Sequence, residues 1–349
     1  MDKPLQDNFN GETESSEETA QTSGVSVLPV KQQLLLLAVM LLLIFGSTLT
    51  PKVLALIRNR DITTAVLTPT ISDITQSVEQ GSEKKSFDDI DLTAKSAYVW
   101  DIQNQKVLFK KNENTALPLA SVAKLMTALI AEEILSDTDV VEIRETAIKQ
   151  DGDSGLVDGE VFDRLSLTDL TLVSSSNDGA FALAAAVGNI LTPNKNGPDS
   201  FVHAMNIRAK EIGLNETYFK NPTGLDISTT QGGAYGSARD MAFLMEYIVK
   251  HAPGILEFTT DDTARVYSTN GQYHDAENTN EYVDKIPGII GSKTGYTDLA
   301  GGNLVIAFNV GLNRPIAISV LGSTQQERFT DTMKLVAETQ KYIANESTQ

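Results

Sequence analysis

The chain has 349 residues, a formal net charge of −18 and no cysteine. Such an acidic chain is not expected to bind nucleic acid, because a phosphate backbone is bound by lysine and arginine. Without cysteine there is no disulfide framework and no thiolate metal site. His203, His251 and His274 lie far apart in the sequence and form no metal-ligand pattern. We therefore predict no metal site and no cofactor.

The first 92 residues differ in composition from the rest of the chain. Residues 1–33 are polar and acidic, with few large hydrophobic side chains, which predicts a disordered tail. Residues 34–57 begin with an almost uninterrupted leucine-rich run and have the length of ~20 residues that a bilayer requires. We predict a single transmembrane anchor here. Residues 58–92 are polar and rich in serine and threonine, which predicts a flexible linker.

Basic residues flank the predicted anchor unequally. Lys31 precedes it, whereas Lys52, Arg58 and Arg60 follow or end it. By the positive-inside rule alone, the C-terminal side would be cytoplasmic. A cleaved signal peptide is the alternative to an uncleaved anchor, but the leader before the apolar run is unusually long for one. We expect an uncleaved anchor.

Residues 93–345 have the pattern of one folded domain. Alternating and apolar runs predict four strands near its two ends, at residues 97–100, 106–109, 303–310 and 315–321. The middle, roughly 121–250, is mostly helical by pattern, and residues 325–344 form an amphipathic helix. We therefore predict an α+β fold, with an antiparallel sheet of about five strands flanked by helices and an inserted helical subdomain.

The stretch LPLASVAKLMTALI, residues 117–130, places one hydroxyl and one ammonium in an apolar helix start. Taken alone, Ser121 is interpreted as a helix cap and Lys124 as a lysine whose ammonium reaches water. The alternative is a nucleophile with its own base, three residues away on one helix face. The Ser-x-x-Lys pattern does not decide between them, because Ser82 and Lys85 also fit it within a polar segment.

Two further motifs follow in chain order. Ser175-x-Asn177 precedes an alanine-rich helix, where by itself it indicates a helix N-cap. Lys293-Thr294-Gly295 follows an apolar segment, where by itself it indicates a strand end and a turn. Together, Ser-x-x-Lys, Ser-x-Asn and Lys-Thr-Gly form the motif set of penicillin-binding proteins and class A β-lactamases.

Residues 93–345 resemble the D-alanyl-D-alanine carboxypeptidases of the S11 peptidase family, which are low-molecular-weight penicillin-binding proteins. The resemblance extends beyond the three motifs, to the phrases LASVAKLMTA, SSNDGAFALA, FVHAMNIRAKEIGLNETYFKNPTGLD, GSARDMAFL, PGIIGSKTGYTDLAGG and RFTDTMKLV. It implies a β-lactamase/DD-peptidase-like fold. It also implies that the enzyme removes the terminal D-alanine of peptidoglycan stem pentapeptides and is inhibited covalently by β-lactams.

The residue types suit this chemistry. Lys124 accepts a proton from Ser121 only if its pKa falls, and burial and the cation Lys293 should both lower that pKa. Ser121 then attacks a peptide carbonyl and forms an acyl-enzyme. By resemblance, the backbone N–H groups of Ser121 and Tyr296 bind the oxyanion. Ser175 would pass the proton to the leaving amine.

The resemblance also assigns substrate contacts. Asn177 would hold the substrate amide, and Lys293 with Thr294 would bind the C-terminal carboxylate. Residues 293–296 would pair with the substrate as an added strand. Arg328 stands where the family has an arginine near the pocket. Residues 278–280 read Asn-Thr-Asn, whereas some members have Asn-Arg-Asn.

Three other functions compete with this one. A class A β-lactamase is suggested by Glu211-Ile212-Gly213-Leu214-Asn215, a match to Glu-x-x-Leu-Asn. We favour a helix that ends at Gly213 with Glu211 in solvent. A D,D-endopeptidase on cross-linked peptidoglycan uses the same motifs and is not separated by them. A non-enzymatic sensor would have lost Ser121, Lys124 or Lys293, and all three are present.

The expected substrate determines the expected location. Peptidoglycan lies outside the cytoplasmic membrane, so we expect a single-pass protein of the bacterial cytoplasmic membrane with an extracytoplasmic domain. This orientation opposes the charge bias around the anchor. Many relatives carry a C-terminal β-domain, but the residues after Gly295 suffice only for the end of the sheet and the last helix. We expect no C-terminal β-domain.

Overall fold

The computed structural model describes residues 87, 89–152, 154–193 and 197–346, all within one compact unit, Gly81–Gln349. The predicted tail and anchor, and most of the predicted linker, lie outside the described residues. Within the described ranges, no helix combines the length and the apolar character needed to cross a bilayer.

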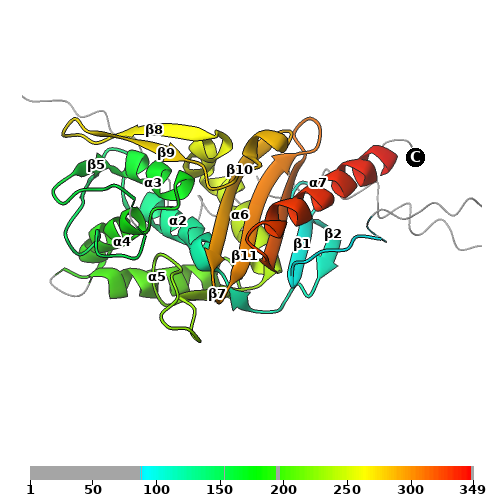
Figure 1. Ribbon diagram of the computed structural model, residues 1–349, viewed down its shortest axis with the longest axis horizontal. Coiled ribbons are helices and arrows are strands. Elements are labelled where there is room, and N and C mark those ends of the chain that lie inside the picture. The colour runs from blue at the N-terminus through cyan, green and yellow to red at the C-terminus, as the bar shows by residue number, and fades with distance from the viewer. Residues whose placement is uncertain (1–86, 88, 153, 194–196, 347–349) are drawn as a thin grey trace, which may run out of the picture. The chain divides into compact units, whose positions relative to one another are not determined.

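A five-stranded antiparallel sheet, in the order β10-β11-β12-β1-β2, forms the centre of the fold (Figure 1). The strands are β1 (Ser96–Asp101), β2 (Lys106–Lys111), β10 (Ile289–Thr297), β11 (Gly301–Asn309) and β12 (Pro315–Ser323). Strand β1 from the start of the domain pairs with β12 from its end. This confirms the predicted sheet built from both ends of the domain, and it places β10 at one edge.

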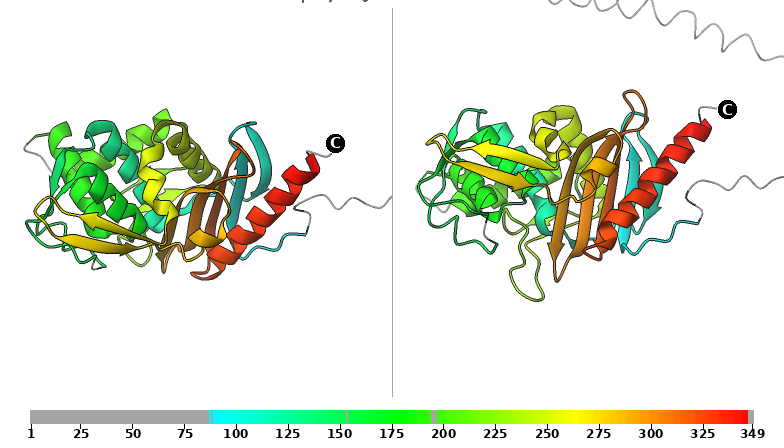
Figure 2. Two further views of the ribbon diagram at one scale, coloured as in Figure 1. Left: turned by 90° about the horizontal axis from the view of Figure 1, so that it is seen from above. Right: turned by 45° about the horizontal axis from the view of Figure 1, so that its top comes forward.

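Helices cover both faces of the sheet. Along β1, Val99 faces one hydrophobic cluster and Trp100 the other, as the two-residue period of a strand requires. Helix α7 (Glu327–Glu346) packs on the first face through buried residues such as Phe329, and α6 (Ala238–His251) packs on the opposite face. Figure 2 shows α7 crossing the outer face of β11 and β12.

The helical subdomain is inserted between β2 and β10. It contains α2 (Lys124–Ile134), α3 (Arg164–Val173), α4 (Asn177–Leu191) and α5 (Gly197–Glu211). Short strands also occur there, namely β3 (Leu117–Pro118), β4 (Val140–Glu142), β5 (Val161–Asp163), β6 (Tyr218–Phe219), β7 (Ala234–Gly236), and the hairpin of β8 (Thr263–Tyr267) and β9 (Tyr273–Glu277). Three 3-10 helices complete the list, η1 (Ala120–Ala123), η2 (Pro253–Thr260) and η3 (Val283–Lys285). The predicted α+β architecture is therefore confirmed, although the middle of the chain is less uniformly helical than its sequence pattern indicates.

Candidate active site

Ser121 lies in the 3-10 turn η1, immediately before α2. Ser121 does not cap a helix, which is the interpretation that the motif suggests when taken alone. Leu119 is the N-cap residue of η1 and Ala123 that of α2, and no side chain caps either helix. The Ser121 hydroxyl instead lies 2.8 Å from Lys124 Nζ. Ala120 has a φ of 49°, a left-handed conformation that costs a non-glycine residue conformational energy and is typical of functional sites. The turn therefore directs the hydroxyl toward the lysine.

Lys124 is completely buried. Its side-chain nitrogen therefore does not reach water, which contradicts the interpretation of Lys124 as a surface lysine. Nζ lies 2.8 Å from Ser121 Oγ, 2.6 Å from Asn177 Oδ1 and 2.9 Å from the Thr223 carbonyl oxygen. Burial, and to a smaller degree the charge of Lys293, hold the pKa of Lys124 well below its ordinary value. Both causes are those that the sequence predicts.

The three contacts of Lys124 fit a neutral amine. A neutral amine has two N–H donors and one lone pair. In the structure Nζ donates to the Asn177 and Thr223 carbonyl oxygens and to Ser121 Oγ. When the amine is neutral, the two carbonyl oxygens still take its two N–H groups, and its lone pair accepts the proton of the Ser121 hydroxyl. This geometry poises Lys124 to remove the Ser121 proton.

The turn between α3 and α4 forms one wall of the site. Ser176 is the N-cap of α4, and its Oγ accepts a hydrogen bond of 2.9 Å from Gly179 N. The helix cap predicted at Ser175-x-Asn177 is therefore Ser176, the middle residue of the motif. Ser175 and Asn177 remain free to face the site. Ser175 has a φ of 62°, and its Oγ accepts a hydrogen bond of 2.9 Å from Lys293 Nζ.

Asn177 connects the lysine to a loop that the sequence analysis did not identify. Its Oδ1 accepts from Lys124, and its Nδ2 donates to the Asp151 carbonyl oxygen at 2.6 Å. Thr223 likewise contributes only a backbone carbonyl. No residue type is required for a backbone contact, so no motif marked Asp151 or Thr223 in the sequence.

Strand β10 forms the opposite wall. Lys293 is buried in the middle of β10, and its Nζ also donates to the Thr294 carbonyl oxygen at 3.1 Å. Burial, reinforced by the nearby Arg328 guanidinium, lowers the pKa of Lys293 to about 7. The Thr294 hydroxyl lies 2.6 Å from the hydroxyl of Thr279, the residue at which this chain departs from Asn-Arg-Asn.

Gly295 allows β10 to pass beside the nucleophile. A Cβ on Gly295 would lie 2.7 Å from the Leu119 carbonyl oxygen and 3.1 Å from Ser121 N, too close to backbone atoms that are unable to move aside. Arg328 is buried, and its Nη1 donates to the Gly295 carbonyl oxygen at 3.0 Å. The next residue, Tyr296, is 43% exposed. The structure thus brings all nine predicted site residues to one place, between η1–α2, α4 and β10.

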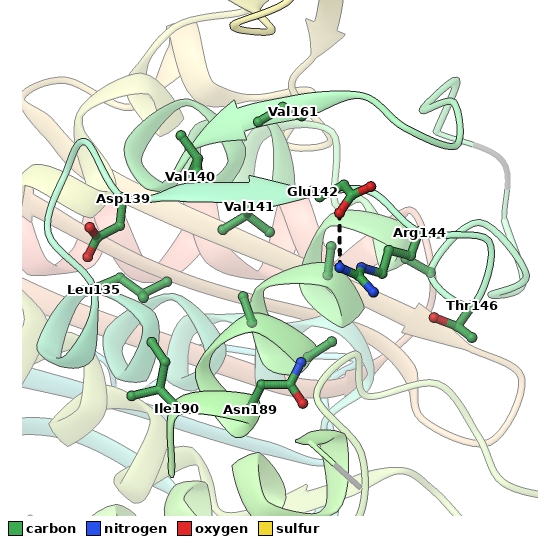
Figure 3. Close-up of a pocket in the computed structure, with 14 residues that line it drawn as sticks. Leu135, Asp139, Val140, Val141, Glu142, Arg144, Thr146, Val161, Asn189 and Ile190 are labelled. Carbon is green, nitrogen blue, oxygen red and sulfur yellow. Dashed lines mark hydrogen bonds and ion pairs between the residues drawn. The ribbon is translucent and has the colours of Figure 1, made fainter. Parts of the chain in front are cut away.

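A cavity of about 530 Å³ lies next to this place. Its lining includes Tyr296 from β10, Asp151 from the loop that contacts Asn177, and Asp226. Another cavity, of about 610 Å³, lies between the β4–β5 hairpin and α4 and is lined by residues such as Val141 and Ile190 (Figure 3). None of the predicted site residues lines that second cavity. Of these two cavities, only the one at the end of β10 is lined by a predicted site residue, Tyr296.

Glu211 is not near the nucleophile. It is an exposed residue at the end of α5, and it forms an ion pair with Arg208, which also binds Glu133 in the last turns of α2. Glu133 lies nine residues beyond Lys124, about 13 Å along the helix. The favoured interpretation of this motif, a helix end near Gly213, agrees with the structure, and Glu211 is not placed to activate water at Ser121.

A serine hydroxyl in contact with a buried lysine whose pKa is strongly lowered defines a serine acyl-transfer site. The family model for D-alanyl-D-alanine carboxypeptidase, peptidase S11, matches residues 81–325. D-alanyl-D-alanine carboxypeptidase DacF of Bacillus subtilis is 33% identical over 249 residues, which cover 70% of this chain and 61% of that protein. D-alanyl-D-alanine endopeptidase of Escherichia coli is 29% identical over 252 residues, 70% of this chain and 76% of that protein. This chain belongs to the S11 family of D-alanyl-D-alanine carboxypeptidases.

Solved structures agree with this assignment. Penicillin-binding protein D2 of Listeria monocytogenes in its ampicillin-bound form superposes with a TM-score of 0.59 at 28% identity. The superposition covers 71% of this chain and 98% of that one. The match to the Bacillus subtilis protein, by contrast, spans less than two thirds of its length.

Proposed function

We propose that this chain is a serine-type D-Ala-D-Ala carboxypeptidase that removes the terminal D-alanine of peptidoglycan stem pentapeptides. The observation that carries the proposal is the environment of Lys124. Its amine is fully buried, contacts two carbonyl oxygens and the Ser121 hydroxyl, and has a strongly lowered pKa. Such a lysine is a base next to a nucleophile.

The reaction proceeds in two transfers. Lys124 takes the Ser121 proton while Oγ bonds to the carbonyl carbon of the penultimate D-alanine, and the oxyanion is stabilised by backbone N–H groups. The C–N bond then breaks, and the proton reaches the leaving amine through the Ser175 hydroxyl. Water then attacks the resulting ester. Lys124 takes a proton from this water and passes it to Ser121 Oγ as the ester bond breaks. The shortened peptide leaves as a carboxylate, and Ser121 regains its hydroxyl.

The opposite wall supplies the substrate contacts in this proposal. Lys293 and the Thr294 hydroxyl bind the terminal carboxylate, and Asn177 holds the substrate amide. The buried Arg328 supports the site from behind, since its guanidinium contacts the Gly295 carbonyl oxygen. The edge position of β10 suits pairing with an extended peptide.

Mass spectrometry of a penicillin adduct tests the nucleophile. We expect one acyl group per chain, on the peptide that contains Ser121, and release of free D-alanine from a pentapeptide. Ser121→Ala should abolish both. Ser82→Ala is the matched control, because Ser82 fits the same four-residue pattern. An adduct that persists in Ser121→Ala would overturn the proposal.

A D,D-endopeptidase is the second candidate, because the Escherichia coli relative carries that name. Both activities use the same acyl-enzyme and differ in the leaving amine. A cross-linked peptide dimer and a free pentapeptide, offered at equal concentration, separate them. We expect faster release of D-alanine from the pentapeptide. Faster cleavage of the dimer would identify the endopeptidase.

We further propose that residues 93–345 form the catalytic domain, held outside the cytoplasmic membrane by residues 34–57 and a linker over residues 58–92. The location of the substrate supports this orientation, and the basic residues after the anchor oppose it. Protease added to intact spheroplasts should remove the domain. Protection of the domain until the membrane is permeabilised would refute the orientation.

A further inference from the structure

A small cavity of about 240 Å³ lies between α3, η2 and β8, and no predicted site residue lines it. Its walls combine carboxylates, hydroxyls and two aromatic rings. They include Asp169 from α3, Phe258 from η2 and Tyr267 from β8. The proposed reaction uses none of these side chains.

Asp169 is 5% exposed, and within the described part of the chain its buried Oδ1 has no hydrogen-bond partner. The neighbouring Asp163, in contrast, uses both oxygens to accept hydrogen bonds from Ser166. Burial raises the pKa of Asp169 to about 7, with Asp163 and Glu257 adding to this rise and Arg164 opposing it. Near neutral pH its carboxyl both donates and accepts hydrogen bonds. A buried polar atom without a partner is unfavourable. Because Oδ1 itself has almost no accessible surface, a ligand hydroxyl in the cavity pairs with it only when the Asp169 side chain turns toward the cavity that it lines.

Two aromatic side chains stand at the same cavity and remain exposed. Tyr267 is 59% exposed and Phe258 is 37% exposed, although large aromatic rings are usually buried. Exposed rings beside a few polar groups are typical of a ligand site with both apolar and polar surfaces. A pyranose ring has this dual character, with C–H groups on its faces and hydroxyls around its edge.

The charges at the cavity disfavour strongly charged ligands. Arg265 lines it, but its Nε and Nη2 donate to Asp275 at 2.6 and 2.9 Å, so its charge is already paired. The carboxylate of Asp163, which lines the cavity, repels anions. Arg164, whose charge acts on the Asp169 carboxyl, opposes a cation there. A neutral ligand with several hydroxyls fits this balance better than an ion of either sign.

The cavity is connected to the catalytic site by the β8–β9 hairpin. Two residues after β9 ends at Glu277, the Thr279 hydroxyl contacts Thr294. Each strand of the hairpin has five residues, which span about 17 Å. The hairpin is visible along the upper edge of the molecule in Figure 1. The cavity thus lies about one strand length from the residues proposed to hold the peptide terminus.

We propose that the cavity between α3, η2 and β8 binds an N-acetylated pyranose of the glycan strand that carries the stem peptide. The inference rests on the proposed function, because that function makes a peptide attached to a glycan the substrate. The sugar face packs on Tyr267 and Phe258, and a hydroxyl pairs with the Asp169 carboxyl. The site would hold the strand while the peptide reaches Ser121.

Binding of the trisaccharide of N-acetylglucosamine to the full chain in detergent tests the site directly. Saturation-transfer NMR gives the affinity without any catalytic step. Tyr267→Ala should weaken binding about 3- to 10-fold, the range for loss of one aromatic contact. Asp169→Leu keeps the side-chain size, removes the hydrogen bonds and should weaken binding similarly. Tyr218→Ala, which removes an exposed tyrosine on β6, should leave binding unchanged.

Turnover gives the second readout. Tyr267→Ala should lower kcat/KM for a pentapeptide attached to its disaccharide about 3- to 10-fold and leave kcat/KM for the free pentapeptide unchanged. Equal trisaccharide binding by wild type, Tyr267→Ala and Asp169→Leu would overturn the inference. Displacement of the sugar by the dication 1,5-diaminopentane would also overturn it, because the cavity would then be a cation site. A wild-type chain that binds the sugar but neither labels with penicillin nor releases D-alanine would refute the proposed function alone.

Discussion

Lys124 Nζ lies 2.8 Å from Ser121 Oγ, in a side chain with 0% exposure. The two residues are three apart in the chain, so the 3-10 turn and the start of α2 bring them together locally. The condition that makes the contact reactive is not local. It requires α4, the residue 223 backbone and β10 to close around the amine and exclude water, because only burial lowers the pKa of the lysine enough.

Replacement of Lys124 by arginine should slow acylation strongly. A guanidinium has a pKa far above that of an amine and remains protonated, so it provides no base for Ser121. We expect the rate of fluorescent penicillin labelling to fall by about 10²–10⁴-fold, the usual contribution of a general base. Lys110→Arg, on the exposed surface of β2, is the control and should label normally. Normal labelling of Lys124→Arg would show that another group is the base.

The pH dependence of kcat/KM should have an alkaline limb near pH 7. Lys293, whose pKa is lowered to about 7, has to be charged to bind a carboxylate, so activity falls as pH rises through that value. Lys124 has to be neutral, so activity falls as pH drops below its own lowered pKa. The two requirements together give a bell-shaped profile, and kcat/KM reports the free enzyme. A profile that is flat from about pH 6 to 9 would contradict these roles.

Gly295→Ala should impair acylation more than stability. The added Cβ meets the Leu119 carbonyl oxygen at 2.7 Å, so β10 has to move away from Ser121. A displacement of about 1 Å at a catalytic centre costs on the order of 10²-fold in rate. The matched control is Gly254→Ala in η2, where a Cβ meets nothing within 4 Å. The penicillin labelling rate and the Tm are measured for both variants. Equal labelling rates in Gly295→Ala and Gly254→Ala would contradict the role assigned to Gly295.

Thr279→Val should raise KM and leave kcat nearly unchanged. If the Thr279 hydroxyl donates to Thr294 Oγ1, at 2.6 Å, the Thr294 hydroxyl is free to donate to the substrate carboxylate. Valine keeps the shape and removes this donor. We expect KM to rise about 3- to 10-fold, as loss of one hydrogen bond implies. Thr263→Val, on an exposed position of β8, is the control. A fall in kcat alone would assign Thr279 another role.

Glu211→Gln should leave β-lactam chemistry unchanged. The carboxylate is exposed, is paired with Arg208 and lies beyond the far end of α2 from Ser121. Nitrocefin should acylate the wild-type chain and the variant at the same rate, with slow turnover in both. Rapid hydrolysis that disappears in Glu211→Gln would instead support a class A β-lactamase.

Much of the fold could be predicted from residue patterns, because they record burial directly. A short apolar run followed by a turn segment predicted β1, and the 3.6-residue period of Phe329 and Val336 predicted α7. The irregular segments between β4 and β5 and between α5 and α6 escaped prediction. They are held mainly by tertiary contacts, such as the bond from Asn177 to the Asp151 backbone, and these leave no periodic pattern.

The sequence by itself determined the identities and order of Ser121, Lys124, Ser175, Asn177 and Lys293, because acyl transfer requires particular side chains at particular spacings. Only the tertiary structure decided which residue caps α4, that the Thr279 and Thr294 hydroxyls meet, and that Asp169 lines a separate cavity with its Oδ1 unpartnered among the described residues. It also decided the charge of Lys124. A pKa depends on the solvent and charges around the group, and burial by distant segments is what sets both.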